Sequence, residues 1–319
     1  MNNDLWPTLP LAEWQDTYAT LHMWTQVVGK IRLAQTPLIN HWWNVPLYVT
    51  TRGLTTSPMP YENRTFEIDF DFIDQQLLIK LDDGAMASLP LRPRSVADFY
   101  REVMETLASL GLHVKIWPVP VEVQDPVPFE QDHKNASYDG EYANRFWRIL
   151  VRADEVFTEF RSRFIGKCSP VNFYWGSFDL AVTRFSGRRA PEREGADVIT
   201  REAYSHEVIS HGFWPGIRAA GPVERSETDG MIHAPAFYSY TAPEPPGLNE
   251  APVRPQQGFY SAGMKEFILL YDDVRNAAAP ENALLDFMQS TYEAGADLAH
   301  WDRASLERKS ETLKSKHSA

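Results

Sequence analysis

Apolar residues recur at every third or fourth position near the start of the chain, which is the spacing of one face of an α-helix. This stripe consists of Trp14, Tyr18, Leu21, Trp24, Val28 and Ile31. It predicts a helix that ends before Pro37, because proline lacks the N–H group that continues a helix. Similar patterns predict further helices at 95–110, 142–164 and 283–298.

Apolar and acidic residues alternate strictly from Phe66 to Phe72. The acidic positions are Glu67, Asp69 and Asp71. Because side chains alternate between the two faces of a strand, this pattern predicts a half-buried antiparallel strand with its acids directed to solvent or to cationic partners. We expect 77–81 to be its hairpin partner, with Lys80 and Arg64 within reach of the acids.

Other segments are predicted to form strands because they are apolar and rich in β-branched or aromatic residues. These segments are 45–51, 113–118, 173–185, 236–241 and 266–271. The acidic, proline-rich stretch 119–128 is expected to be an extended connector. The polar end of the chain, from 305 to 319, is expected to be a frayed helix or disordered.

Two segments of the chain match without a gap. Asn40-His41-Trp42-Trp43 aligns with Asn172-Phe173-Tyr174-Trp175, and in each case a Thr-Arg pair follows after seven residues. Each segment also follows a Gly-Lys pair, Gly29-Lys30 or Gly166-Lys167, that is expected to end a helix. The pattern favours an ancient duplication, in which Trp43 and Trp175 occupy equivalent places, over a chance match of few identities.

These elements predict an α+β fold made of two pseudo-repeats, each an antiparallel sheet with helices on one face, around a shared aromatic core. The expected divisions are 1–130 for the first pseudo-repeat, 131–301 for the second and 302–319 for a polar tail.

Several stretches also resemble a bacterial protein family described only as a domain of unknown function. The resemblance rests on 29–50, on 166–172, on Trp175-Gly176-Ser177-Phe178-Asp179-Leu180-Ala181 and on Tyr204-Ser205-His206-Glu207. It extends over nearly the whole chain. It implies no established activity and no catalytic residue.

Composition narrows the classes of partner. The net charge of −12 opposes non-specific binding to nucleic acid, and the cluster Arg184, Arg188, Arg189 and Arg193 is interpreted as a loop of solvated charges. No apolar run is long enough for a membrane-spanning helix, and the N-terminal residues do not form a secretion signal. Cys168 is the one cysteine, so a reducing cytoplasm is the expected location.

Common catalytic and nucleotide-binding motifs are absent from the sequence. There is no Walker or dinucleotide-binding glycine motif, no G-x-S-x-G and no H-E-x-x-H. The densest group of acid, base or metal-binding side chains is His206, Glu207 and His211. His206 and His211 are five residues apart, a spacing that does not place two side chains on the same face of a helix or of a strand. Joint metal ligation would therefore need a turn between them. No metal is therefore expected, and any cofactor is unknown.

Other candidates lie among aromatic residues. Asp179, inside an apolar segment, either pairs with Arg184 structurally or joins it to hold a polar ligand over Trp175. His41 stands where the second copy has Phe173, which indicates either divergence towards function or a core histidine bonded to a carbonyl.

The first functional hypothesis is a small-molecule-binding protein or enzyme with an aromatic-lined polar cleft between the two halves. Its catalytic candidates are His206, Glu207 and Asp179, and its ligand-binding candidates are His41, Trp43, Trp175, Arg184 and Tyr204. In an enzyme, His206 would be the acid or base and Arg184 would hold an anionic group. The alternative is a non-catalytic protein that uses its aromatic surface in a homodimer or to bind a partner.

Overall fold

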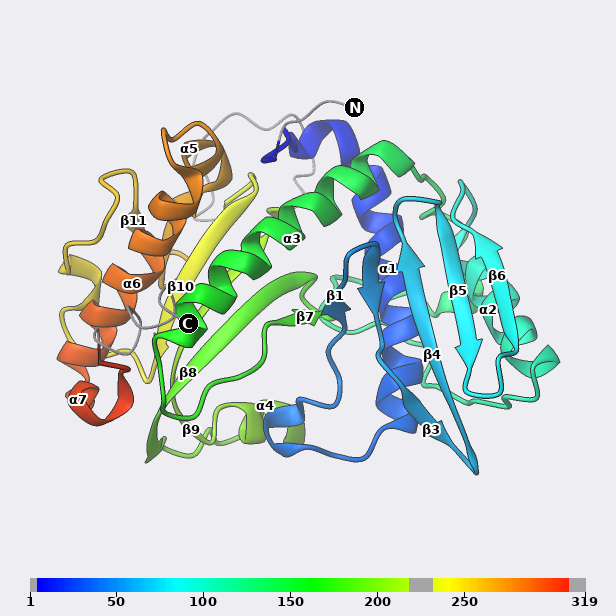
Figure 1. Cartoon of the computed structure of the whole chain (residues 1–319), viewed down its shortest axis with the longest axis horizontal. Helices are drawn as coiled ribbons and strands as arrows, with labels where there is room; N and C mark the ends of the chain where they lie inside the picture. The colour runs from blue at the N-terminus through cyan, green and yellow to red at the C-terminus, as the bar shows by residue number, and fades with distance from the viewer. Residues whose placement is uncertain (1–4, 218–231, 310–319) are drawn as a thin grey trace, which may run out of the picture. The chain divides into compact units, whose positions relative to one another are not determined.

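The computed structural model describes residues 5–217 and 232–309, and the chain divides into two compact units (Figure 1). Unit 1 consists of Met1–Ile39, Trp43–Val151 and Asn172–Asp179, and unit 2 consists of Asn40–Trp42, Arg152–Val171 and Leu180–Ala319. These units are not the expected halves, so the division at 130 stays a prediction about ancestry. The fold is α+β, and every strand pairing described within the two units is antiparallel.

Unit 1 combines an antiparallel sheet with helices, and Figure 1 shows α2 behind β5 and β6. Its helices are α1 (Leu11–Gln35), α2 (Val96–Ser109), the 3-10 helix η2 (Phe129–Gln131) and the first part of α3 (Gly140–Ser162). Its strands are β1 (Tyr48–Val49), β2 (Gly53–Thr55), β3 (Met59–Tyr61), β4 (Arg64–Asp71), β5 (Gln76–Leu81), β6 (Met86–Pro90) and β7 (Asn172–Tyr174). The sheet order is β1-β2-β4-β5-β6, with β3 paired to β4.

The alternation that predicted β4 is confirmed. Phe66, Ile68 and Phe70 are buried on one face, and β5 is the hairpin partner. On the other face Lys80 contacts Glu67 at 3.4 Å and Asp69 at 2.5 Å, as expected. The partners of Arg64 differ from the prediction. Its guanidinium donates to the carbonyl oxygens of Leu110 and Gly111 at the end of α2.

Asp71, the last acid of β4, is buried rather than solvated, with 3% of its surface exposed. Its carboxylate accepts from Arg52 Nε at 2.6 Å and from the backbone N–H groups of Ile73 and Asp74 at 2.9 and 3.0 Å. Burial on its own raises the pKa of Asp71, but these hydrogen bonds outweigh it and hold the pKa below its ordinary value. Asp71 therefore stabilises the turn into β5 as an anion.

We expect Asp71→Ala to lower the free energy of unfolding by about 1 to 3 kcal/mol at pH 7, because it removes a buried carboxylate that accepts from Arg52 and from two backbone N–H groups. Since the folded pKa lies below the ordinary value near 3.9, this difference should shrink as the pH falls below about 4. Urea denaturation at pH 7 and pH 3 measures both effects. Asp74→Ala is the matched control, because Asp74 also pairs with Arg52 but is exposed. Equal losses for the two variants would contradict the prediction.

Unit 2 contains a second antiparallel sheet, with order β11-β12-β10-β9-β8. Its strands are β8 (Asp179–Arg189), β9 (His206–Trp214), β10 (Ala236–Ala242), β11 (Phe259–Ser261) and β12 (Glu266–Leu270). Its helices are the 3-10 helices η1 (Asn40–Trp42) and η3 (Leu248–Glu250), the second part of α3, and α4 (Val198–Ala203), α5 (Tyr271–Arg275), α6 (Pro280–Leu298) and α7 (Arg303–Leu306). Figure 1 shows α6 beside β10, and Gly295 permits the approach, since a Cβ there would lie 2.2 Å from the Thr241 hydroxyl.

Two ionisable side chains lie inside the core of unit 2. Arg184 is 1% exposed, donates to the carbonyl of Phe160, and places its guanidinium carbon 3.4 Å from the Phe160 ring centre and 4.3 Å from that of Tyr292. Burial lowers the pKa of Arg184 to about 10. His211 is fully buried on β9, and its Nε2 lies 3.0 Å from the Thr291 hydroxyl. Burial, and secondly the charge of Arg184, lower the pKa of His211 well below its ordinary value.

His211 should therefore make unit 2 sensitive to mild acid. The folded chain keeps the imidazole neutral, whereas the unfolded chain takes up a proton as the pH falls below about 6.5. Between pH 7 and pH 5 we expect the native chain to lose about 1 to 2 kcal/mol more stability than His211→Phe, which removes the titration and keeps the ring. Chemical denaturation across this range gives the comparison, and parallel pH profiles for the two chains would refute the assignment.

Several sequence predictions need correction. Segment 113–118 is not a strand, and its Trp117 is 71% exposed. Strand β9 runs through His206–Trp214 without the turn considered between its histidines. Segment 45–51 forms the two-residue strand β1 and an isolated bridge from Leu47 to Phe173, and Pro46 interrupts its start. Among the described helices none is long and apolar enough to cross a membrane.

The duplication is not confirmed. Asn40–Trp42 forms a 3-10 helix, whereas the matching Asn172–Tyr174 forms strand β7. Gly29-Lys30 lies inside α1, whereas Gly166-Lys167 follows the end of α3. The two copies therefore differ in local structure, and the duplication stays a prediction.

Candidate functional site

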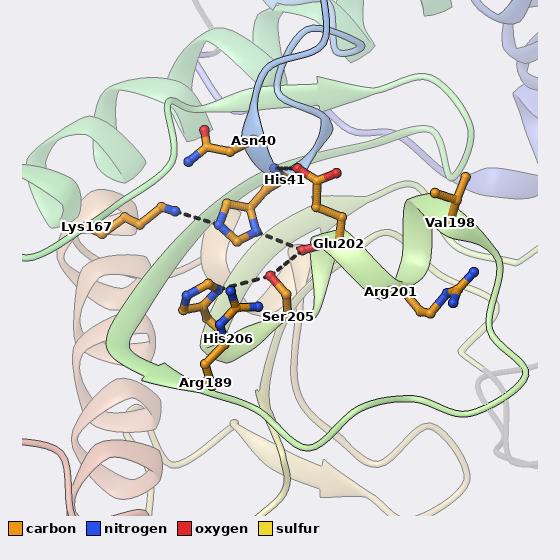
Figure 2. Close-up of a pocket in the computed structure, with 9 residues that line it drawn as sticks. All are labelled: Asn40, His41, Lys167, Arg189, Val198, Arg201, Glu202, Ser205 and His206. Carbon is orange, nitrogen blue, oxygen red and sulfur yellow. Dashed lines mark hydrogen bonds between the residues drawn. The ribbon is translucent and has the colours of Figure 1, made fainter.

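A pocket of about 520 Å³ lies within unit 2, where η1, α4 and the paired ends of β8 and β9 meet (Figure 2). Its lining residues are Asn40, His41, Lys167, Arg189, Val198, Arg201, Glu202, Ser205 and His206. The volume falls in the range of small-molecule sites.

His41 enters the pocket from a strained turn. His41 and Trp42 adopt φ values of +58° and +60°, the left-handed region that is costly for residues with a Cβ. Glu202 offsets this cost with two contacts to His41. The His41 backbone N–H donates to Glu202 Oε1 at 3.1 Å, and Nδ1 lies 3.0 Å from the Glu202 carbonyl oxygen. A carbonyl oxygen can only accept, so Nδ1 carries the proton and Nε2 has a lone pair.

The Glu202 carbonyl lies at the C-terminal end of α4, where it also accepts the Ser205 backbone N–H at 3.2 Å. Asp197 caps the start of this short helix through the N–H groups of Ile199 and Thr200, and Ala203 is its last residue. The carbonyl groups in the last turn of a helix have no partner within it. The oxygen of Glu202 therefore accepts from His41 and also from Ser205 Oγ, at 2.8 Å.

Lys167 is held against β8 by its backbone and reaches His41 with its side chain. Its carbonyl accepts from the Phe185 N–H at 3.0 Å, and its ammonium group lies 5.1 Å from the Phe185 ring centre. The Nζ atom is 2.6 Å from His41 Nε2. Because Nε2 carries the lone pair, Lys167 is the donor in this contact.

His206 occupies the same pocket with the same tautomer. Its Nδ1 lies 3.0 Å from Ser205 Oγ, whose hydroxyl proton already bonds the Glu202 carbonyl. Nδ1 must therefore donate, which leaves the lone pair on Nε2. The ring centres of His206 and His41 are 5.5 Å apart. The structure thus brings two neutral imidazoles and one amine together (Figure 2).

A bulge in β8 places Arg189 opposite His206. The regular pairing of β8 with β9 stops after Phe185 and resumes at Arg189, which lies opposite His206. Gly187, with φ +88°, lies in the interruption between them. Residues directly opposite in adjacent strands have neighbouring side chains. The guanidinium of Arg189 lies beside His206 in Figure 2.

The pocket changes the pKa of three of its side chains. Burial, and secondly the charge of Lys167, lower the pKa of His41. Burial lowers the pKa of Lys167, although the Glu202 carboxylate acts in the opposite direction. For His206, burial is again the first cause of a lowered pKa, followed by the charges of Arg189 and Lys167. Both histidines are thus kept neutral at pH 7, and Lys167 loses its proton more readily than an exposed lysine.

Lys167, Arg189 and Arg201 give the lining three cations against a single carboxylate, that of Glu202. The pocket is therefore positive in a chain whose net charge is −12. Within the described residues, no group of three or more His, Cys, Asp or Glu side chains is placed to hold a metal ion. His206 and His211 lie on opposite faces of β9, so they do not form a shared metal site.

Of the residues selected from sequence, only His41 and His206 line this pocket. Glu207 follows His206 on the strand and faces the other way, where it binds Arg188 at 2.7 Å, so it does not orient the histidine. Asp179 accepts from the Ser177 hydroxyl. Tyr204 contacts the Tyr240 hydroxyl at 2.9 Å and stacks under Arg193.

The remaining candidates have structural positions. Arg184 is enclosed by aromatic rings, so it does not hold a ligand at the surface. Trp175 is 4% exposed in unit 1 and donates to the Val45 carbonyl at 2.9 Å. Trp43 is a half-buried residue of the same unit.

Sequence reasoning missed Lys167, Arg189, Arg201 and Glu202 as site residues. Lys167 was noticed only as part of a Gly-Lys repeat, and Arg189 only within a cluster taken as solvated. The usable signal was the combination of that basic cluster with Tyr204-Ser205-His206-Glu207 across one hairpin. Glu202 and Arg201 gave no local signal, because their role depends on where α4 ends.

Comparison with known proteins adds no activity to this geometry, because no curated protein and no solved structure matches the chain. A family model, described as a family of unknown function (DUF5996), matches residues 6–308. That match includes every residue of the pocket and nearly the whole chain, and the chain therefore belongs to this family of unknown function.

Proposed function

We propose that the protein binds a small organic anion in the pocket formed by η1, α4, β8 and β9. The observation that carries this proposal is the excess of cations among the lining residues, where Lys167, Arg189 and Arg201 surround a pocket of about 520 Å³. Guanidinium and ammonium groups hold carboxylates and phosphates through charge-assisted hydrogen bonds. The neutral ring of His206 adds a polar group that can accept a hydrogen bond from the ligand.

The negative charge of the pocket, on the Glu202 carboxylate, takes part in a hydrogen bond within the protein. Glu202 Oε1 accepts the backbone N–H of His41, so this carboxylate holds η1 in place. Its charge is therefore less available to repel an anion than that of a solvated side chain. The proposed site replaces a cleft between the sequence halves, because the residues that support it belong to unit 2 alone.

The interaction-protein hypothesis gains no support from the aromatic residues that suggested it. Trp175 is packed inside unit 1, and Tyr204 is engaged by Tyr240 and Arg193. We also propose a bacterial, cytoplasmic protein, since the chain's one cysteine, Cys168, suits a reducing compartment.

We expect calorimetric titration to detect binding of phosphate or succinate and no binding of glycerol, which lacks charge. Arg189→Ala should weaken anion binding about tenfold, because it removes one charge-assisted contact. Added sodium chloride should weaken it further through screening. Arg254→Ala is the control, since this exposed arginine pairs with Glu293 and does not line the pocket. Undetectable binding of both anions, or equal losses in the two variants, would overturn the proposal.

A further inference from the structure

We propose that Lys167 is a nucleophilic amine that forms an imine with a small aldehyde or ketone carrying an anionic group, with His41 as the base. This inference rests on the proposed anion site and names the substrate class of that site. It stands on the 2.6 Å contact between Lys167 Nζ and His41 Nε2, inside a pocket that also presents Arg189.

In the contact between Lys167 and His41 the ammonium group donates to the imidazole, as proton removal from an amine nucleophile requires. The Glu202 carbonyl fixes the proton of His41 on Nδ1, so the Nε2 lone pair faces the lysine ammonium group and can take a proton from it. The Glu202 carbonyl has the role of an orienting third group behind a base. Phe185 supports both partners, since its ring lies 4.6 Å from the His41 ring and 5.1 Å from Lys167 Nζ.

The electrostatics of the pocket support the same role. An ordinary lysine is almost entirely protonated at neutral pH, because its pKa is near 10.4. Burial lowers the pKa of Lys167, so a larger fraction of this amine is neutral at a given pH. The charge of Lys167 also lowers the pKa of His41, which keeps the imidazole available as a base.

The step balances without an oxidant or reductant. His41 takes one proton from the ammonium group, and the freed nitrogen lone pair forms a C–N bond as the carbonyl π electrons move to oxygen. The resulting carbinolamine then loses its oxygen as water, and the C–O bond breaks as the C=N bond forms. Two of the three ammonium hydrogens leave in that water, and the third remains on the iminium nitrogen. The net charge is unchanged.

Two other lining residues have positions suited to the same substrate. Arg189 is the cation that would hold the anionic group of the substrate, because it lies opposite His206 on the neighbouring strand and lines the same pocket. His206 presents Nε2 to the pocket and can carry the proton that the departing oxygen requires. A purely structural Lys–His contact would need neither of these neighbours.

Reductive trapping tests the inference directly. The full chain is incubated with glyoxylate or with glycolaldehyde phosphate in the presence of sodium cyanoborohydride, and the product is analysed by intact mass and peptide mapping. We expect a single adduct at Lys167, formed at least about tenfold faster than at the exposed Lys265, as a lowered amine pKa allows. The faster probe identifies carboxylate or phosphate as the preferred anionic group. Acetaldehyde, which has no anionic group, should react slowly.

Variants separate this inference from the anion site itself. Lys167→Arg should bind phosphate within about threefold of the native chain, since the charge remains, and should form no adduct at this position. His41→Asn should keep the amine but slow its labelling, and Lys265→Arg should label normally. Circular dichroism and thermal melting establish that each variant is folded.

Each outcome decides one of the two proposals. Adducts spread over many lysines, or Lys167 no faster than Lys265, would overturn imine formation. If phosphate still binds in that case, the proposed function stands without it. If the folded native chain shows neither selective labelling of Lys167 nor phosphate binding, both imine formation and the proposed anion site are overturned.

Discussion

The carbonyl oxygen of Glu202 organises the pocket, because it fixes the proton positions of both histidines. It accepts from His41 Nδ1 directly and from the Ser205 hydroxyl, which in turn receives the His206 Nδ1 proton. Each imidazole is thereby left with its lone pair on Nε2. The oxygen lies at the C-terminal end of α4, where it also accepts the Ser205 backbone N–H at 3.2 Å.

Charge and burial act together at this site. An acidic chain keeps its pocket positive by placing Lys167, Arg189 and Arg201 there and by engaging Glu202 with the backbone of η1. The same burial that lowers the pKa of Lys167 also prevents the neighbouring imidazoles from charging at pH 7. The pocket thus combines the permanent charges of Arg189 and Arg201 with neutral imidazoles and an amine of lowered pKa.

The predictable parts of the structure were those that depend on local pattern. The alternation in β4 predicts a strand with one buried face, and the structure has one. The apolar spacing in α1 also predicts a helix, although most of α1 is buried on every side. Asp71 faces a cationic partner, as expected, but the alternation indicated neither that this partner is Arg52 nor that the carboxylate is buried.

The candidate site was only partly predictable, because its members come from distant parts of the chain. The sequence hypothesis assigned His41 and His206 to one cleft, yet nothing in their neighbourhoods indicated which other residues line it with them. The sequence placed Arg184 in a cluster of solvated charges, in a structural pair with Asp179 or in a ligand site, whereas the structure buries it against rings on α3 and α6. Local sequence identifies a cation but not what surrounds it.

The enclosure of Arg184 also constrains how the protein is made. The guanidinium of Arg184 contacts the rings of both Phe160 and Tyr292. In the sequence, Phe160 precedes Arg184 and Tyr292 comes long after it. Arg184 emerges from the ribosome well before Tyr292 is synthesised, so the nascent chain carries this cation without one of the three rings that surround it. The core of unit 2 can therefore close only after α6 has emerged.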